Sequence, residues 1–261
     1  MIKSILIMFF VSSILAVNIT YSSSYIDTSL SFKYYEYDVN INTSSSDFFT
    51  GQFNISQNGK RLFSMDSSFS DYVEHKFIDL NGDGSKEMLL YLTEGASPYV
   101  FHYLYVFDRI RSAKPLYVLQ NGELDTSVYG KPLLSVNSRM SPAVLGLWYS
   151  WFLKYEDNKL KYFKPVDSRS RVLGPDFVSI RENLDELNKN NQICDDFAYN
   201  VFFEYVFITS KIAGEETAAE RFFEENYKCE NKTASLKQFK TTASENYSWI
   251  KDEENYKYTE Y

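Results

Sequence analysis

Oxygen-bearing side chains alternate along the stretch from residue 79 to residue 87, within a turn that contains two glycines. They are Asp79, Asn81, Asp83, Ser85 and Glu87. Ca²⁺ takes about six to eight oxygen ligands, and a tight turn with oxygen donors at every second position can supply them. Counting Asp79 as position one, Gly84 stands at position six, where a calcium loop bends sharply. The spacing predicts a Ca²⁺ site formed by the side chains at positions one, three, five and nine and by the Ser85 carbonyl.

The sequence around the loop distinguishes it from an EF-hand. An EF-hand has Glu at position twelve and a helix on each side, whereas position twelve here is Leu90, within an apolar run typical of a strand. The plainer alternative is that residues 81–84, Asn-Gly-Asp-Gly, form a good hairpin turn and nothing more. A turn alone leaves the positions of Asp79 and Glu87 unexplained, so we predict the metal site.

The pattern strand–Asp-x-Asn-x-Asp-Gly-x-x-Glu–strand resembles the calcium loops of FG-GAP or VCBS-type repeats, known from integrin-α-like β-propellers and many secreted bacterial proteins. The resemblance covers the loop and its two flanking strands, and it implies the same five residues as ligands of a structural Ca²⁺. The chain carries a single copy and ends in a helical region that belongs to no propeller blade, so a full propeller is not expected. A weaker similarity is to periplasmic lysozyme-inhibitor-like proteins with one such loop.

Residues 1–22 predict a cleaved signal peptide. Lys3 gives a positive start, residues 5–17 are apolar apart from two serines, and Thr20 and Ser22 are small residues where a signal peptidase reads the chain. The alternative is an uncleaved N-terminal anchor. No later stretch is apolar over the length of a bilayer. We therefore expect a periplasmic or extracellular protein without a transmembrane helix after signal cleavage.

Two cysteines, Cys194 and Cys229, are the only ones in the chain. In an oxidising compartment such an isolated pair predicts a disulfide. If the two helices between them fold back at Gly214, both cysteines come to the same end of the helix pair. Together with the distant His75 and His102 they do not form a zinc motif.

The composition excludes some classes of partner. The formal net charge is −8, and 44% of the residues are hydrophobic. An acidic chain without a basic stripe does not suit nucleic acid or an anionic lipid surface. A packed globular core is expected.

The periodicity predicts an α+β protein in which an antiparallel β domain precedes a helical bundle. Short strands with Asn-Gly turns occupy residues 23–165 and favour a sandwich or partial propeller. The expected strands cover residues 30–41, 51–56, 61–65, 73–78, 87–92, 99–107, 115–119, 143–155 and 159–163. A linker is expected at residues 166–175 and a helical domain at residues 176–261.

The helical part begins with a capping box at Ser179 and continues with three further segments. Residues 197–212 are apolar on most sides and predict the central helix, while residues 215–227 and a segment from about residue 235 have one apolar stripe each. The last ten residues are polar and aromatic, and we expect them to fray.

No catalytic constellation stands out, so we expect a non-catalytic binding or structural module with an unknown protein or glycan partner. His75 and His102 lie in apolar strands and read as packed or surface histidines. The segment from Trp148 to Trp151 suits either core packing or a protein- or carbohydrate-binding face. The alternatives are a periplasmic inhibitor of a cell-wall hydrolase such as lysozyme and a hydrolase with an unrecognised site.

Overall fold

The computed structural model describes residues 28–44, 51–66, 69–94, 100–127, 129–140, 147–164 and 197–259, together with residues 181, 182, 184, 185, 188 and 194. The predicted signal peptide and the predicted linker at residues 166–175 lie outside the described residues, as does Ser179 of the predicted capping box.

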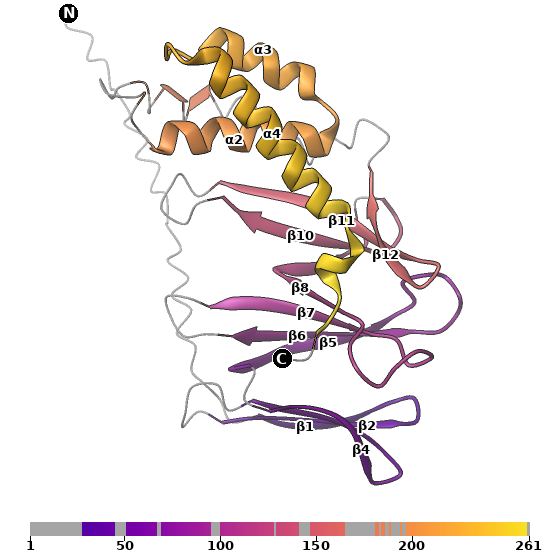
Figure 1. Cartoon of the computed structure of the whole chain (residues 1–261). Helices are drawn as coiled ribbons and strands as arrows, with labels where there is room; N and C mark the ends of the chain where they lie inside the picture. The colour runs from indigo at the N-terminus through magenta and orange to yellow at the C-terminus, as the bar shows by residue number, and fades with distance from the viewer. Residues whose placement is uncertain are drawn as a thin grey trace, which may run out of the picture.

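Within the described residues the strands form three antiparallel sheets of four strands each, and neighbouring strands in each sheet follow one another in the chain. Sheet A consists of β1 (Thr28–Tyr34), β2 (Tyr37–Thr43), β3 (Gln52–Gln57) and β4 (Lys60–Asp66). Sheet B consists of β5 (Asp71–Ile78), β6 (Glu87–Glu94), β7 (Phe101–Phe107) and β8 (Tyr117–Gln120). Sheet C consists of β9 (Gly122–Asp125), β10 (Leu133–Arg139), β11 (Trp148–Glu156) and β12 (Lys159–Phe163). The sheets lie in layers, with the helices beyond sheet C (Figure 1).

Sheet B is the middle layer, and apolar side chains project from both of its faces. On β6, Leu89 packs into the cluster shared with sheet C, whereas Met88 and Leu90 pack into the cluster shared with sheet A. On β7, Val106 packs into the cluster shared with sheet C, and Tyr105 packs into the cluster shared with sheet A. Strands with both faces covered need apolar residues at consecutive positions, which explains the unbroken apolar runs of β6 and β7.

Sheet A corrects one expected strand. Residues 30–41 were predicted as a single strand, but they form a hairpin that turns at Tyr35, whose φ is 54°. The next hairpin follows the prediction, because Asn58 and Gly59 both have positive φ between β3 and β4. Asn-Gly permits this backbone at low cost, whereas tyrosine seldom adopts it.

Sheet C contains two strands that were not predicted, β9 and β10. Asn137 lies within β10 and is paired with Ser150 of β11. β9 has only four residues, too few for an alternating pattern to show. The turn at Asn121, whose φ is 52°, joins sheet B directly to sheet C.

The helices are α2 (Phe197–Ala213), α3 (Glu216–Asn226) and α4 (Lys232–Lys251), followed by the 3₁₀ turn η3 (Glu253–Tyr256). α2 packs against α3, α4 and β11, as expected for the central apolar helix. Gly214 ends it with φ of 76°, a left-handed conformation that glycine adopts freely. Cys194 and Cys229 are joined in a disulfide with 5.6 Å between their Cα atoms, so the predicted pairing is confirmed.

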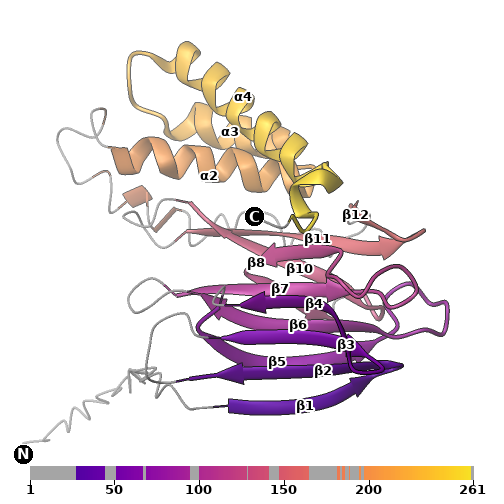
Figure 2. The same ribbon diagram turned by 60° about the horizontal axis from the view of Figure 1, so that its bottom comes forward.

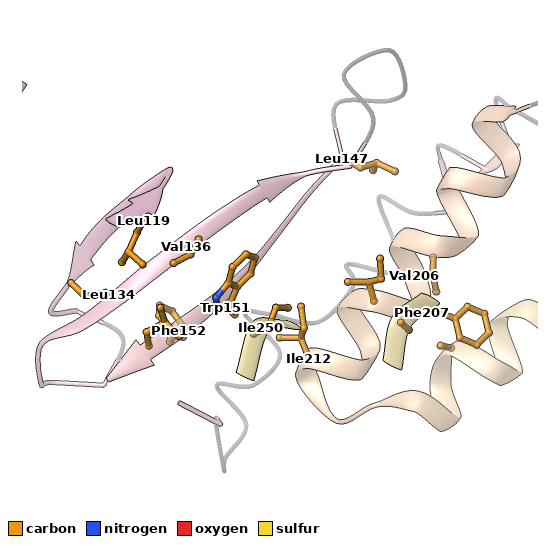
Figure 3. Close-up of a cluster of buried hydrophobic side chains, with 14 of the residues drawn as sticks. Leu119, Leu134, Val136, Leu147, Trp151, Phe152, Val206, Phe207, Ile212 and Ile250 are labelled. Carbon is orange, nitrogen blue, oxygen red and sulfur yellow. The ribbon is translucent and has the colours of Figure 1, made fainter. Parts of the chain in front are cut away.

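One apolar cluster joins the helices to the sheets. Figure 3 shows side chains of β8, β10 and β11 gathered with those of α2 and α4, among them Val136, Trp151, Ile212 and Ile250. Trp151 is 2% exposed. The helical region and the sheets therefore share a core rather than meeting through a polar interface.

Residues 252–259, called the returning segment below, correct the prediction of a frayed end. Tyr256 is buried, and its hydroxyl accepts a hydrogen bond from Trp151 Nε1 (3.0 Å). Lys257 forms a β-bridge with Tyr117 of β8. Tyr258 packs edge-on against Phe63 of sheet A at 5.8 Å between ring centroids. The segment thus runs from the helices past sheets C and B (Figure 1) to a side chain of sheet A, the sheet that is turned toward the viewer in Figure 2.

The predicted α+β class is confirmed: antiparallel sheets precede the helices, and the sheets do not close into a barrel. Of the helices in the described part of the chain, none has both the length and the apolar character needed to cross a membrane.

Candidate metal centre

The predicted calcium loop joins β5 to β6 at one end of sheet B, and Asp79 organises its turn. The Asp79 carboxylate accepts hydrogen bonds from three backbone N–H groups of the loop, at 2.7 Å from Gly82, 3.2 Å from Asp83 and 2.8 Å from Gly84. Gly82 and Gly84 have φ near +80°, where a side chain would be strained. The glycines therefore allow the backbone to close around this carboxylate.

Asn81 and Asp83 continue the same network. Asn81 Oδ1 accepts from the backbone N of Asp83 at 3.0 Å, and its Nδ2 donates to Asp83 Oδ2 at 3.0 Å. Asp83 Oδ1 accepts from the backbone N of Ser85 at 2.7 Å. Four of the five predicted ligand residues are thus linked within one exposed turn.

Glu87 lies beneath the turn as the first residue of β6, and it is 1% exposed. Its Oε2 accepts a hydrogen bond from the backbone N of Leu80 at 2.7 Å. Burial raises the pKa of its carboxyl from 4.5 to about 7, and the nearby charges of Asp108 and Asp83 act in the same direction. No lysine or arginine among the described residues forms an ion pair with it.

Sheet A supports the loop through two adjacent tyrosines of the first hairpin. Tyr35 Oη accepts a hydrogen bond from the backbone N of Lys86 at 2.6 Å. Tyr34 Oη donates to the carbonyl oxygens of Lys86 (3.1 Å) and Phe107 (3.2 Å). Burial raises the pKa of the Tyr34 hydroxyl, so this group remains a neutral donor at physiological pH. The end of the loop is therefore fixed by contacts from another sheet.

A second buried acid, Asp108, lies close to Glu87 and was not predicted to be part of the site. It is 3% exposed, accepts from Tyr155 Oη at 2.8 Å and forms an ion pair with Arg111 at 3.5 Å. Its carboxylate therefore has a cationic partner, whereas none of the described residues forms an ion pair with Glu87. In the sequence, the only signal for it is an acid placed directly after the apolar strand β7.

The loop at residues 79–87 offers oxygen atoms of the kinds that bind Ca²⁺. Its charged side chains do not enclose a common point from all sides. Within the described residues, no three His, Cys, Asp or Glu side chains form a metal-holding group. The loop combines carboxylate, amide and carbonyl oxygens. Asp79 Oδ2 and the two carboxylate oxygens of Asp83 accept one hydrogen bond each, so each of these three oxygens retains a further lone pair. A cation bound at Asp79, Asp83 and Glu87 would offset the cost of burying the Glu87 charge.

The two histidines lie on different strands of sheet B, His75 on β5 and His102 on β7. His75 stacks on Phe32 with 3.9 Å between ring centroids, and its Nδ1 hydrogen-bonds with Tyr72 Oη at 2.8 Å. Burial lowers the pKa of its imidazole. His102 is exposed on β7. These are the packed and surface histidines that the sequence predicted.

A scan against protein-family models, a search of curated proteins and a search of solved structures each found no match to this chain.

Proposed function

We propose that this protein is an exported, calcium-stabilised binding or structural module without catalytic activity, located in the periplasm or outside the cell. The observation that carries the proposal is Glu87, a desolvated carboxylate beneath a turn of oxygen donors, to which no cationic side chain of the described residues is paired. Asp79, Asn81, Asp83 and Glu87 would hold the ion with side-chain oxygens, and Ser85 would add its carbonyl. Ca²⁺ would supply the positive charge that this pocket lacks.

The role of such a site is structural because the loop joins two strands of the middle sheet and is fixed by Tyr34 and Tyr35 of sheet A. Holding the turn closed would hold these two layers in register. Outside the cytoplasm Ca²⁺ is plentiful, and sites with dissociation constants of about 10⁻⁴–10⁻³ M are typical of extracellular modules. The predicted signal peptide and the Cys194–Cys229 disulfide support export, since disulfides persist in oxidising compartments.

A thermal melt of the mature protein tests this function. We expect the midpoint to rise when millimolar Ca²⁺ replaces a chelator, because an ion that binds only the folded state stabilises it by mass action. The variant Asp83→Ala should lose most of this rise. Asp66→Ala, which removes an exposed acid at the end of β4, is the matched control and should retain it. Equal midpoints with Ca²⁺ and with chelator would end the proposal.

A further inference from the structure

A groove of about 580 Å³ lies where β5, β6 and β7 of sheet B meet β9, β10 and β11 of sheet C. Its volume is in the range of small-molecule sites. The turn at Asn121 forms part of its lining, and so does Gly122. A Cβ atom at Gly122 would lie 2.6 Å from Leu119 Cβ, so glycine is what permits sheets B and C to approach closely here.

Trp148 gives the groove an exposed aromatic surface. It is the first residue of β11 and is 48% exposed, in contrast to Trp151, which is 2% exposed. Arg139 stands opposite it in the strand register, with the guanidinium 5.9 Å from the ring centroid. A solvent-exposed indole that is oriented by its neighbour offers a flat apolar surface, as the C–H face of a sugar ring requires.

Polar groups in the groove are held in fixed positions. Ser150 Oγ donates to Asn137 Oδ1 at 2.5 Å, which fixes the side-chain amide and leaves its Nδ2 without a protein acceptor among the described residues. Tyr91 Oη accepts from the backbone N of Leu124 at 3.1 Å, which leaves its own hydrogen for donation. The groove therefore presents fixed donors beside an aromatic surface, a combination suited to hydroxyl groups.

The charges in the groove disfavour an anionic ligand. Glu74 and Glu123 line it together with Lys76. Lys76 Nζ is already 2.6 Å from Glu74 Oε1 and lies over the Tyr91 ring at 5.0 Å from its centroid. The Lys76 ammonium group is thus already paired with Glu74, and Glu123 remains as a hydrogen-bond acceptor for ligand hydroxyl groups. A neutral ligand rich in hydroxyl groups fits this balance.

We propose that the groove between sheets B and C binds a neutral oligosaccharide, with Trp148 stacking on a sugar ring and Asn137, Tyr91 and Glu123 hydrogen-bonding to hydroxyl groups. The inference names a partner for the binding module proposed above. It does not depend on Ca²⁺, since no predicted ligand of the calcium loop lines the groove.

Titration of the mature, full-length protein with cellotetraose, maltotetraose and chitotetraose tests the proposal, with calorimetry and tryptophan fluorescence as readouts. We expect at least one of the three to bind, and we expect Trp148→Ala to weaken that binding about tenfold or more, as loss of a central aromatic anchor does. Trp249→Ala is the matched control because Trp249 is equally exposed, at 50%, but lies on α4. It should bind the sugar as the unmodified protein does.

Circular dichroism of each variant establishes that it is folded. The proposal is overturned if none of the three sugars binds at millimolar concentration, or if folded Trp148→Ala binds as well as the unmodified protein. Repeating the titration in chelator separates the two proposals. Binding that persists there supports the groove even when the calcium melt shows no shift.

Discussion

At the scale of single residues, Glu87 is the group whose surroundings fit its charge least. The side chain is almost completely buried, its hydrogen bonds come from the backbone N–H groups of Leu80 and of Glu87 itself, and two further carboxylates are near. Such a site favours either a proton or a bound cation. The loop sequence pointed to this residue as a ligand, but its burial and its neighbour Asp108 depend on how three sheets meet.

The raised pKa of Glu87 makes stability depend on pH in metal-free buffer. The folded pKa is about 7 and the ordinary value is 4.5, so the folded state binds the proton more tightly. This contribution to stability is fully present below pH 4.5 and is lost as the pH rises through about 7. It amounts to roughly 3 kcal/mol, at about 1.4 kcal/mol for each pKa unit.

Urea denaturation of the metal-free protein between pH 4.5 and pH 8 measures this term. Glu87→Gln keeps the shape and the acceptor for the Leu80 N–H but does not titrate, so the difference between the two proteins isolates Glu87. We expect the unmodified protein to lose stability with rising pH relative to the variant. Parallel curves for the two proteins would contradict the assignment.

At the scale of elements, the disulfide connects the region before α2 to the residues after α3. Its two cysteines are separated by 35 residues. Closing a loop of this length removes conformational entropy from the unfolded chain and stabilises the fold by roughly 3–4 kcal/mol on the chain-entropy model. Its effect should therefore appear mainly in the helical region, where both ends of the bridge lie.

Chemical denaturation with and without reductant tests this contribution. Reduction of the unmodified protein should lower the unfolding free energy by about 3–4 kcal/mol. The double variant Cys194→Ser, Cys229→Ser should match the reduced protein and should not respond to reductant. An unmodified protein whose denaturation midpoint is the same in reductant would show that the bridge does not contribute.

Most elements could be predicted from the sequence where local chemistry determined them. Asn58-Gly59 and Gly214 carry their own backbone preference, and both ended their elements as expected. Tyr35 does not, because its positive φ is held by distant contacts. Its hydroxyl meets the Lys86 N–H, and the Arg109 guanidinium lies 3.6 Å from the centroid of its ring. Lys86 and Arg109 are both far from Tyr35 in the sequence, so the residues next to Tyr35 give no sign of a turn. For this reason the hairpin was predicted as a single strand.

At the scale of the whole molecule, the returning segment connects layers that are otherwise joined only to their neighbours. Tyr256 contacts Trp151 of sheet C and Ile250 of α4, to whose carbonyl its hydroxyl donates at 2.7 Å. Tyr258 reaches sheet B as well as sheet A, since its ring packs edge-on against Tyr105 of β7 with 6.2 Å between the ring centroids. The sequence suggested fraying because the segment is polar, whereas two tyrosines determine its course.

Tyr256→Ala should lower the unfolding free energy by about 3–5 kcal/mol, the usual cost of removing a large buried ring. Tyr256→Phe keeps the ring but leaves the buried Trp151 Nε1–H without its acceptor, and should cost about 1–3 kcal/mol. Glu254→Ala is the control, because its ion pair with Lys257 is exposed and such pairs contribute little. Equilibrium denaturation in urea gives all three values, and a Tyr256→Ala protein as stable as the control would contradict this role.

The path of residues 252–259 has a consequence for the order in which the chain folds. Tyr117 and Glu253 are hydrogen-bonded across 136 residues, and Trp151 and Tyr256 across 105. Such contacts have a high contact order and form slowly, whereas the meander hairpins are local and form early. In an intermediate whose sheets have formed while residues 252–259 are still undocked, Trp151 and Tyr117 would be accessible to water. The change in Trp151 fluorescence as its side chain becomes buried therefore reports the last step of folding.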